Sequence, residues 1–312
     1  MSKVTDLIKS KGEFSYSFEV TPDVQEDKLR SLCADPLFFS VTWHAKSHQC
    51  ESLSINPIRM VCLLKSIHKH VLLHLTCDML RKEYLNELLT MLQENGICNL
   101  FLTLGGKYLY ITQMLLNRIY FPRNNFKQTL NYDAIEYRQG YTMPTLIMMM
   151  NSRLHSKLIQ TKEKIDIGAN FIITQAFFDA EVFVEFKNKC DKIGIVVPIV
   201  PGVFAFETHK QLVGFINLCK IKVADDLLQH VESNEKLHTP GIHIIKQLIH
   251  DLNSKCGVNH IHFFTLNQLN KVCSFMEQRV LPRELTPWRD REAYCVTNMS
   301  DYILDRLYVL FT

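Results

Sequence analysis

Residues 170–179 read Asn170-Phe-Ile-Ile-Thr-Gln-Ala-Phe-Phe-Asp179, an apolar, β-branched run that turns polar at Thr174 and Gln175 before a helical pattern begins. The run predicts a buried parallel strand. In α/β proteins the carboxyl ends of parallel strands face the ligand, so a Thr-Gln pair at this point is a candidate binding site. The alternative is that Gln175 only caps a loop.

The same pattern recurs along the chain, with segments of helical periodicity in between. The candidate strands are Ser15–Val20, Leu37–Trp43, Val71–Thr76, Ile97–Leu104, Ala134–Arg138, Phe171–Gln175, Val196–Pro201 and His260–Leu266. Eight β-then-α units in 312 residues predict an α/β fold of the (β/α)8 TIM barrel type, as one domain over residues 1–280. A doubly wound open sheet is the alternative, but it would need a glycine-rich turn after the first strand, where Thr21-Pro22 stands.

Composition and charge argue against several classes of protein. The net charge is only +3 and the basic residues are scattered, so no nucleic-acid partner is expected. The longest apolar run is far too short to span a membrane and the first twenty residues resemble no leader, so we expect a cytoplasmic protein without a membrane partner. His260 and His262 alternate along one predicted strand, but no carboxylate or cysteine joins them at a ligand spacing, so no metal site is expected.

On a barrel, the residues at the strand ends converge on one mouth. These are Glu19, Thr42, His74, Gly105, Gly106, Lys107, Gln175 and Gln268. A carboxylate at the end of an apolar strand is desolvated, which raises its pKa and suits Glu19 to general acid catalysis, although a salt-bridged rim position is the alternative. Thr42 and His74 can hydrogen-bond a planar heterocycle. Lys164 can meet either a phosphate or solvent.

Several motifs carry a resemblance to a known family. They are Ser17-Phe18-Glu19, Ser40-Val41-Thr42-Trp43, His74-Leu75-Thr76-Cys77, Gly168-Ala169-Asn170-Phe171 with the stretch quoted first, Pro198-Ile199-Val200-Pro201-Gly202, and His262-Phe263-Phe264-Thr265-Leu266-Asn267. In order and spacing, from about residue 12 to residue 278, the chain resembles the methylenetetrahydrofolate reductase family. The resemblance implies a flavin-binding TIM barrel in which NADPH or NADH reduces FAD. The reduced flavin then converts 5,10-methylenetetrahydrofolate to 5-methyltetrahydrofolate.

The resemblance also implies roles for individual residues. Glu19 corresponds to the general acid. Gln175 and Gln268 are matched to residues that contact the folate, and Phe215 to a residue that packs against the folate or the nicotinamide. Those matched to the FAD site are Thr42, His74, Gly105, Gly106, Lys107, Tyr141 and Lys164.

The chain departs from the family pattern mainly around the flavin. Leu104-Gly105-Gly106-Lys107 stands where the family has Leu-Arg-Gly-Asp, and Gln268 stands where it has arginine. A lysine in place of an aspartate reverses the local field beside the flavin. Two interpretations follow: a working, diverged reductase, or a catalytically impaired barrel that binds a folate or a protein partner.

Residues 281–312 are interpreted as a linker-like segment followed by a helix over Tyr302–Phe311. The apolar face of that helix is expected to pack either on the barrel or on a second copy in a homo-oligomer. The segment is too short for the regulatory domain of the animal forms, so feedback by S-adenosylmethionine is not expected.

Overall fold

The computed structural model describes residues 2–43, 52–75, 81–102, 152–166, 169–219, 221–234, 240–277 and 308–310. Within these ranges the strands form one curled sheet in the order β4-β3-β2-β1-β7-β6-β5-β8. The parallel strands are β1 (Ser15–Val20), β2 (Phe39–Val41), β3 (Val71–Leu75), β4 (Leu100–Leu102), β5 (Phe171–Ala176), β6 (Ile199–Val203) and β7 (His260–Phe264). A further strand, β8 (Tyr308–Leu310), pairs antiparallel with β5.

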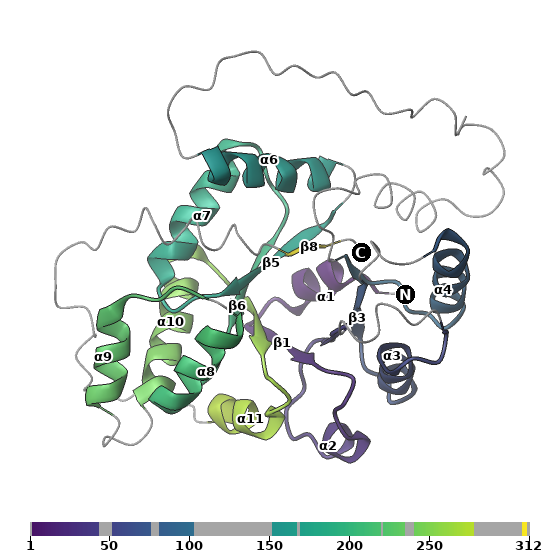
Figure 1. The fold of residues 1–312 in the computed structure, drawn as a ribbon, viewed down its shortest axis with the longest axis horizontal. Helices are drawn as coiled ribbons and strands as arrows, with labels where there is room; N and C mark the ends of the chain where they lie inside the picture. Colours follow the sequence, from purple (N-terminus) through teal and green to yellow (C-terminus); the bar gives the residue numbers. More distant parts are fainter. Residues whose placement is uncertain are drawn as a thin grey trace, which may run out of the picture.

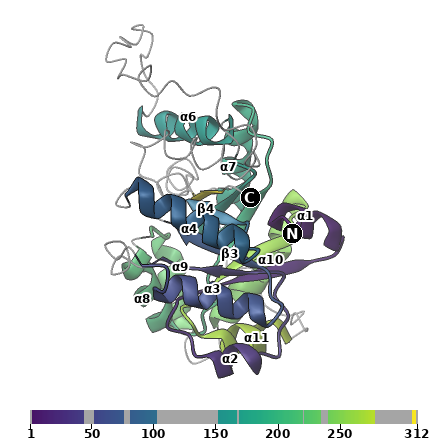
Figure 2. The ribbon, with the colours of Figure 1, turned by 90° about the vertical axis from the view of Figure 1, so that its right-hand side faces the viewer.

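Helices surround this sheet (Figure 1). They are α1 (Val4–Lys11), α2 (Glu26–Arg30), α3 (Asn56–Ser66), α4 (Lys82–Glu94), α6 (Ser152–Asp166), α7 (Ala180–Lys192), α8 (His209–Cys219), α9 (Asp225–Ser233), α10 (Pro240–Cys256) and α11 (Leu269–Glu277). Figure 2 shows α3 and α4 side by side on one flank. In the described ranges no helix is long and apolar enough to cross a membrane.

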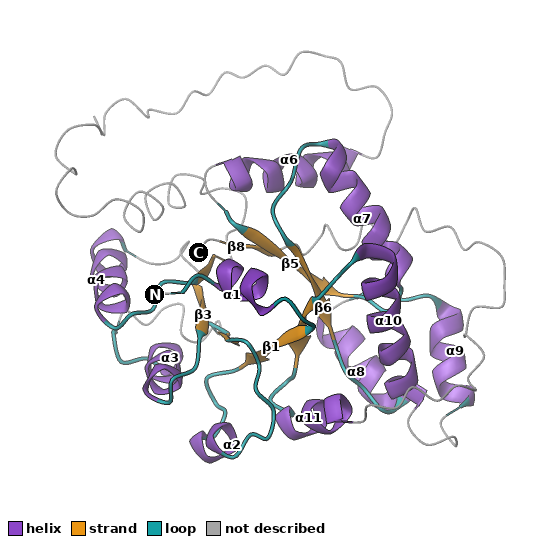
Figure 3. Ribbon diagram, turned by 180° about the vertical axis from the view of Figure 1, so that it is seen from behind, coloured by secondary structure: helices purple, strands orange, loops and turns teal. Residues whose placement is uncertain are grey.

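Helix α1 precedes the first strand and lies across the end of the barrel where the strands begin (Figure 3). The backbone N–H of Val4 donates to the side-chain oxygen of Asn99, just before β4, at 3.1 Å. Val4 and Ile8 are buried, which holds the helix against the sheet. This N-terminal end of the barrel is opposite to the mouth at which the candidate site residues gather.

The predicted barrel is confirmed in its parallel α/β architecture and its single domain. Seven of the eight predicted strands coincide with β1 to β7, and the predicted strand Ala134–Arg138 lies outside the described residues. β1 matches its prediction residue for residue, whereas β4 covers only the middle of the predicted Ile97–Leu104.

The helix predicted over Tyr302–Phe311 is wrong for the three residues that the structure describes, because Tyr308–Leu310 form the strand β8. Their register on β5 pairs Phe171 with Leu310 and Ile173 with Tyr308. β8 also contacts β4, so it lies between the edges of β4 and β5. A Tyr-Val-Leu run has high strand propensity, and pairing to an open strand edge overrides the helical periodicity of the sequence.

The two faces of β1 and β7 differ in polarity. Phe18 and Phe263 lie edge to face, and Phe263 packs on Phe275 of α11, so this face points toward the helices. The alternate residues therefore point into the barrel. On β1 these inward residues are Ser15, Ser17 and Glu19, whereas branched apolar side chains usually fill such interiors. The polar interior is the basis of the candidate site.

Candidate functional site

Glu19 lies at the carboxyl end of β1, with Ser40 of β2 and Phe264 of β7 as its register neighbours. Its side chain is half-buried. Burial penalises the charged form and raises the pKa of the Glu19 carboxyl from 4.5 to about 7. A carboxyl group with this pKa is partly protonated near neutral pH, so it can hold a proton and donate it.

A turn after β7 fixes the backbone on both sides of Glu19. The hydroxyl of Thr265 donates to the backbone oxygen of Glu19 at 2.5 Å. The side-chain oxygen of Asn267 accepts the backbone N–H of Thr21 at 2.9 Å. Leu266 and Asn267 adopt positive φ angles of 45° and 60°. The turn thus anchors the end of β1 to the end of β7, so that the backbone of Glu19 is held in one position.

The Thr-Leu-Asn motif is visible in the sequence, but no role was predicted for Thr265 or Asn267. The available signal was the asparagine, which tolerates the left-handed conformation better than most residues and hydrogen-bonds nearby backbone groups. The neighbouring Gln268, which was predicted to meet the folate, is exposed at the start of α11. Its backbone N–H donates to the carbonyl of Thr265 at 2.8 Å and completes the turn.

His74 and Thr42 lie at the ends of the next two strands. The Nε2 atom of His74 is 2.5 Å from the hydroxyl of Ser40, and the imidazole stacks on Phe101 with ring centroids 4.1 Å apart. Thr42 is half-buried, and its backbone N–H donates to the carbonyl of Val20 at 3.0 Å. The fixed imidazole and the threonine hydroxyl are therefore presented at the same end of the barrel as Glu19.

Gln175 lies at the end of β5, as the sequence predicted, and is buried. Its side-chain oxygen accepts the backbone N–H of Ala176 at 3.0 Å. The hydroxyl of Thr174 accepts the backbone N–H of Gly202 at 3.0 Å and joins β5 to β6. A Cβ atom on Gly202 would lie 2.3 Å from the Thr174 carbonyl oxygen and 2.5 Å from the Phe264 ring, so glycine is required for this close packing.

Phe215 and Lys164 come from helices. Phe215 of α8 is buried and stacks on Phe204, with ring centroids 3.8 Å apart. It also lies 6.4 Å from Phe264, the register neighbour of Glu19, so an aromatic wall extends from α8 to the mouth. Lys164 is in the last turn of α6 and is half-buried, and burial lowers the pKa of its ammonium group. A partly desolvated cation is suited to an anionic group such as a phosphate.

The remaining predicted cofactor residues lie outside the described residues. They are Gly105, Gly106, Lys107 and Tyr141. In the described part of the chain no group of three or more His, Cys, Asp or Glu side chains is placed to hold a metal ion.

Beneath Glu19, a hydrogen-bonded chain of serines and histidines fills the barrel interior. Ser15 Oγ lies 2.8 Å from His260 Nδ1, and His260 Nε2 lies 3.2 Å from Ser17 Oγ. Ser17 Oγ in turn lies 2.8 Å from His262 Nδ1. Phe38 stacks on both imidazoles. In the sequence the two histidines stand out only as an incomplete set of metal ligands, because the pairing of β1 with β7 is not visible there.

These features define an α/β barrel with a proton-holding carboxyl group, a fixed imidazole and an aromatic wall at the C-terminal mouth. The sequence profile described as Methylenetetrahydrofolate reductase matches residues 3–119 and 136–279. The chain belongs to the methylenetetrahydrofolate reductase family.

Individual relatives agree with this assignment. Methylenetetrahydrofolate reductase (NADH) 1 of Arabidopsis thaliana is 26% identical over 296 residues, covering 85% of this chain and 48% of the plant protein. The 5,10-methylenetetrahydrofolate reductase of Pectobacterium carotovorum subsp. carotovorum is 29% identical over 288 residues, covering 84% of this chain and 89% of the bacterial protein. The chain therefore spans about half the length of the plant relatives and most of the bacterial one.

One solved structure shares the fold. It is described as an uncharacterized protein from Clostridium thermocellum that binds two copies of 5-methyl-5,6,7,8-tetrahydrofolic acid. The TM-score is 0.50 at 13% identity, with 88% of this chain and 97% of that chain covered. At this identity the likeness concerns the fold alone.

Proposed function

We propose that this chain reduces 5,10-methylenetetrahydrofolate to 5-methyltetrahydrofolate, with FAD as the bound cofactor and NADPH or NADH as the reductant. The observation that carries the proposal is Glu19, a carboxyl group with a pKa of about 7 at the mouth of a barrel of this family. The reaction consumes one proton together with the hydride. In its protonated form, Glu19 donates that proton to folate N10 as the bond between N10 and the bridging carbon breaks.

The described residues fit a flavin at the same mouth. His74 is buried and held by Ser40, and Thr42 adds a hydroxyl group, so both can hydrogen-bond the edge of a planar ring. Lys164 supplies a half-buried cation for a phosphate. FAD, when bound, would supply the hydride, while the barrel orients the folate and excludes water from the reacting atoms.

Gln175 and Phe215 are proposed to bind the folate. The side-chain oxygen of Gln175 is occupied by the Ala176 N–H, which leaves its amide N–H₂ group as the natural donor to a pterin. Phe215 extends the apolar surface beside Phe264 against which a flat ring can pack. Gln268 is exposed beside the anchoring turn and is proposed as a polar contact for the outer part of the substrate.

The visible absorption spectrum of the purified protein tests the proposal. A flavin band should be bleached by anaerobic NADPH or NADH and should return when 5,10-methylenetetrahydrofolate is added. The initial rates with the two nucleotides identify the preferred reductant. A colourless protein that cannot be reconstituted with FAD would contradict the enzyme assignment.

A second candidate function is that of an impaired barrel that still binds a folate or a protein partner. The observation in its favour is Lys107, which stands where the family has an aspartate. If the wild-type protein binds no FAD, Lys107→Asp separates the causes. Recovery of the flavin band in this variant would assign the defect to the lysine, and a folate titration of the wild-type protein by calorimetry would measure the remaining binding function.

A further inference from the structure

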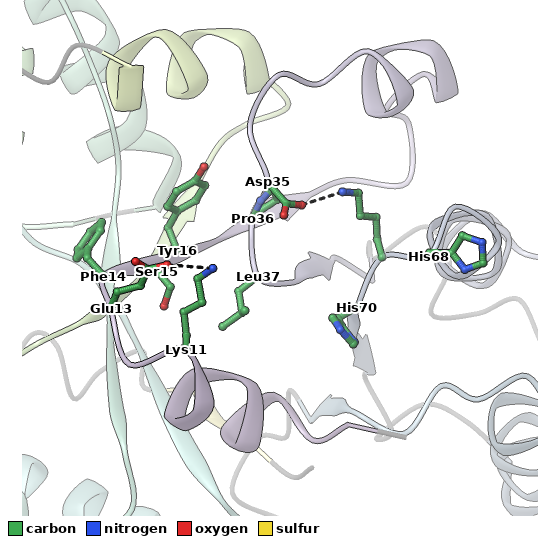
Figure 4. A pocket seen from close by; sticks show the side chains of 11 residues that line it. Lys11, Glu13, Phe14, Ser15, Tyr16, Asp35, Pro36, Leu37, His68 and His70 are labelled. Carbon is green, nitrogen blue, oxygen red and sulfur yellow. Dashed lines mark hydrogen bonds and ion pairs between the residues drawn. The ribbon is translucent and has the colours of Figure 1, made fainter.

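The interior chain of serines and histidines runs inward from the N-terminal end of the barrel. Its outer end meets solvent-filled space, since Ser15 lines a pocket of about 420 Å³ at the N-terminal end (Figure 4). His260 lines a second pocket of about 310 Å³ near the same end. Ser17 and His262, further inside, are 0% and 1% exposed. The chain thus begins at the surface opposite to the mouth and runs into the buried interior.

Its inner end points along β1 toward Glu19. Glu19 is the next inward residue after Ser17, about 7 Å further along the strand. His262 is the register partner of Ser17 and, through Nδ1, the last hydrogen-bonded member of the chain. Its Nε2 atom is not used in these contacts, so it is the position from which a proton can pass on.

We propose that Ser15, His260, Ser17 and His262 form a proton pathway that recharges Glu19 from the N-terminal end of the barrel. The inference rests on the proposed reductase function, in which each turnover consumes one proton at Glu19. It adds an entry site and two residues, Ser15 and His260, that have no contact with the mouth.

The geometry suits the transfer of a proton without a stable charged intermediate. Burial lowers the pKa of His260 to about 3 and that of His262 well below its ordinary value, with the nearby His74 adding to the effect on His262. Both rings are therefore neutral at pH 7, and a neutral imidazole has one donor and one acceptor nitrogen. Each ring can accept a proton on one nitrogen while it releases one from the other. Phe38 stacks on both imidazole rings and so restricts their orientation.

The proton balance is simple. After Glu19 has given its proton to folate N10, its carboxylate is recharged with the proton of His262 Nε2. A water molecule must relay this proton, because no direct hydrogen bond joins the two side chains. Each O–H or N–H proton of the chain then moves one position inward, and Ser15 recovers a proton from the outer pocket. Carboxylates and imidazoles around this pocket can collect it from water; they belong to Glu13, Asp35, His68 and His70.

Entry from this side has a physical reason. With folate and flavin bound, water is excluded from the mouth, so the general acid has no direct contact with bulk solvent there. The pocket at the opposite end lies away from the mouth, and the chain of 2.8, 3.2 and 2.8 Å contacts links it to the interior.

Two variants interrupt the pathway without touching Glu19. His260→Phe removes both ring nitrogens and keeps the stacking partner of Phe38, and Ser15→Ala removes the outermost hydroxyl. His243→Phe is the matched control, because His243 is a half-buried histidine of α10 that does not belong to the hydrogen-bonded series of Ser15, His260, Ser17 and His262. The measurement is anaerobic stopped-flow absorption of the flavin-loaded protein, with reduction by NAD(P)H and reoxidation by 5,10-methylenetetrahydrofolate recorded separately.

Reoxidation by the folate is expected to slow at least tenfold in both variants, while reduction by NAD(P)H and folate affinity stay unchanged. In a third variant, His260→Ala, added imidazole is expected to restore the rate by occupying the vacated space. Wild-type reoxidation rates in both His260→Phe and Ser15→Ala would overturn the pathway. Slow reoxidation that imidazole fails to raise would also overturn it, because packing alone would then explain the loss. An inactive wild-type protein would instead contradict the proposed function itself.

Discussion

Glu19 is expected to work in its protonated form, so the folate half-reaction should lose rate as the pH rises. With a pKa of about 7, the protonated fraction falls tenfold for each pH unit well above 7. Stopped-flow reoxidation between pH 5.5 and 9 measures this profile. Glu19→Gln, which has no proton to give, should reduce the rate by a factor of about 10² to 10⁴ at every pH. A pH-independent wild-type rate would contradict the role of Glu19 as acid.

The same raised pKa predicts that the protein becomes less stable as the pH rises. A carboxylate in an ion pair would have the opposite effect. Because the folded state binds the Glu19 proton more tightly than the unfolded state, stability falls between pH 4.5 and about 7 and then levels off. The loss is at most roughly 3 kcal/mol. Urea unfolding of the wild-type protein and of Glu19→Gln should therefore give similar free energies at pH 4.5 and a more stable variant at pH 8. If the free energies of unfolding of the two proteins changed with pH in the same way, the raised pKa of Glu19 would be contradicted.

Asn267 should matter for activity through the backbone that it holds. Asn267→Ala removes the acceptor of the Thr21 N–H and places alanine at a φ of 60°, so we expect a loss of about 1–3 kcal/mol in stability. We also expect slower folate reoxidation, with the Glu19 pH profile shifted. Asn267→Gly relieves the backbone strain but not the lost hydrogen bond, so a glycine variant that behaves as wild type would assign the effect to strain alone.

At the scale of elements, the close contact between β5 and β6 requires a residue without a side chain at Gly202. Gly202→Ala forces a Cβ atom against the Thr174 carbonyl and the Phe264 ring, so overpacking should cost about 1–3 kcal/mol. Gly214→Ala is the matched control, because nothing lies within 4 Å of its Cβ position in the helix α8. It should stabilise the protein by up to about 1 kcal/mol. Thermal unfolding of both variants checks the opposite signs.

The strand β8 should stabilise β5 and, through it, the site at Gln175. Val309→Pro removes a backbone N–H and fixes φ, which is incompatible with regular pairing to Ile172. Hydrogen exchange of the peptide covering β5 should become faster, whereas Val309→Thr, which keeps the branched side chain and the N–H, should leave it unchanged. Equal protection of β5 in the two variants would show that β8 does not stabilise β5.

The sequence predicted the elements whose signals are local. β1 alternates polar and apolar residues, and it was predicted with its observed bounds. α1 was missed because Lys3, Lys9 and Lys11 obscure its short apolar face, which is buried only by the end of the barrel. β8 was missed because its partner, β5, lies more than a hundred residues away in the chain.

The candidate site was predictable to a similar extent. The strand ends identified Glu19, Thr42, His74 and Gln175, since parallel strands must present their carboxyl ends together. The interior chain could not be predicted, because it requires the register that pairs Ser15 with His260 and Ser17 with His262. The turn at Asn267 likewise depends on a positive φ angle, which hydrophobic periodicity in the sequence does not reveal.

At the scale of the whole molecule, the strand β8 bears on how the protein is made. β1 to β4 and β5 to β7 emerge from the ribosome before residues 308–310, so among the described strands the edge of β5 that pairs with β8 stays unpaired until those residues are made. Unpaired strand edges recruit strands from other chains. The nascent barrel should therefore need a holding chaperone. Its yield in cells should fall when chaperones are depleted, by more than the stability of the purified protein would predict.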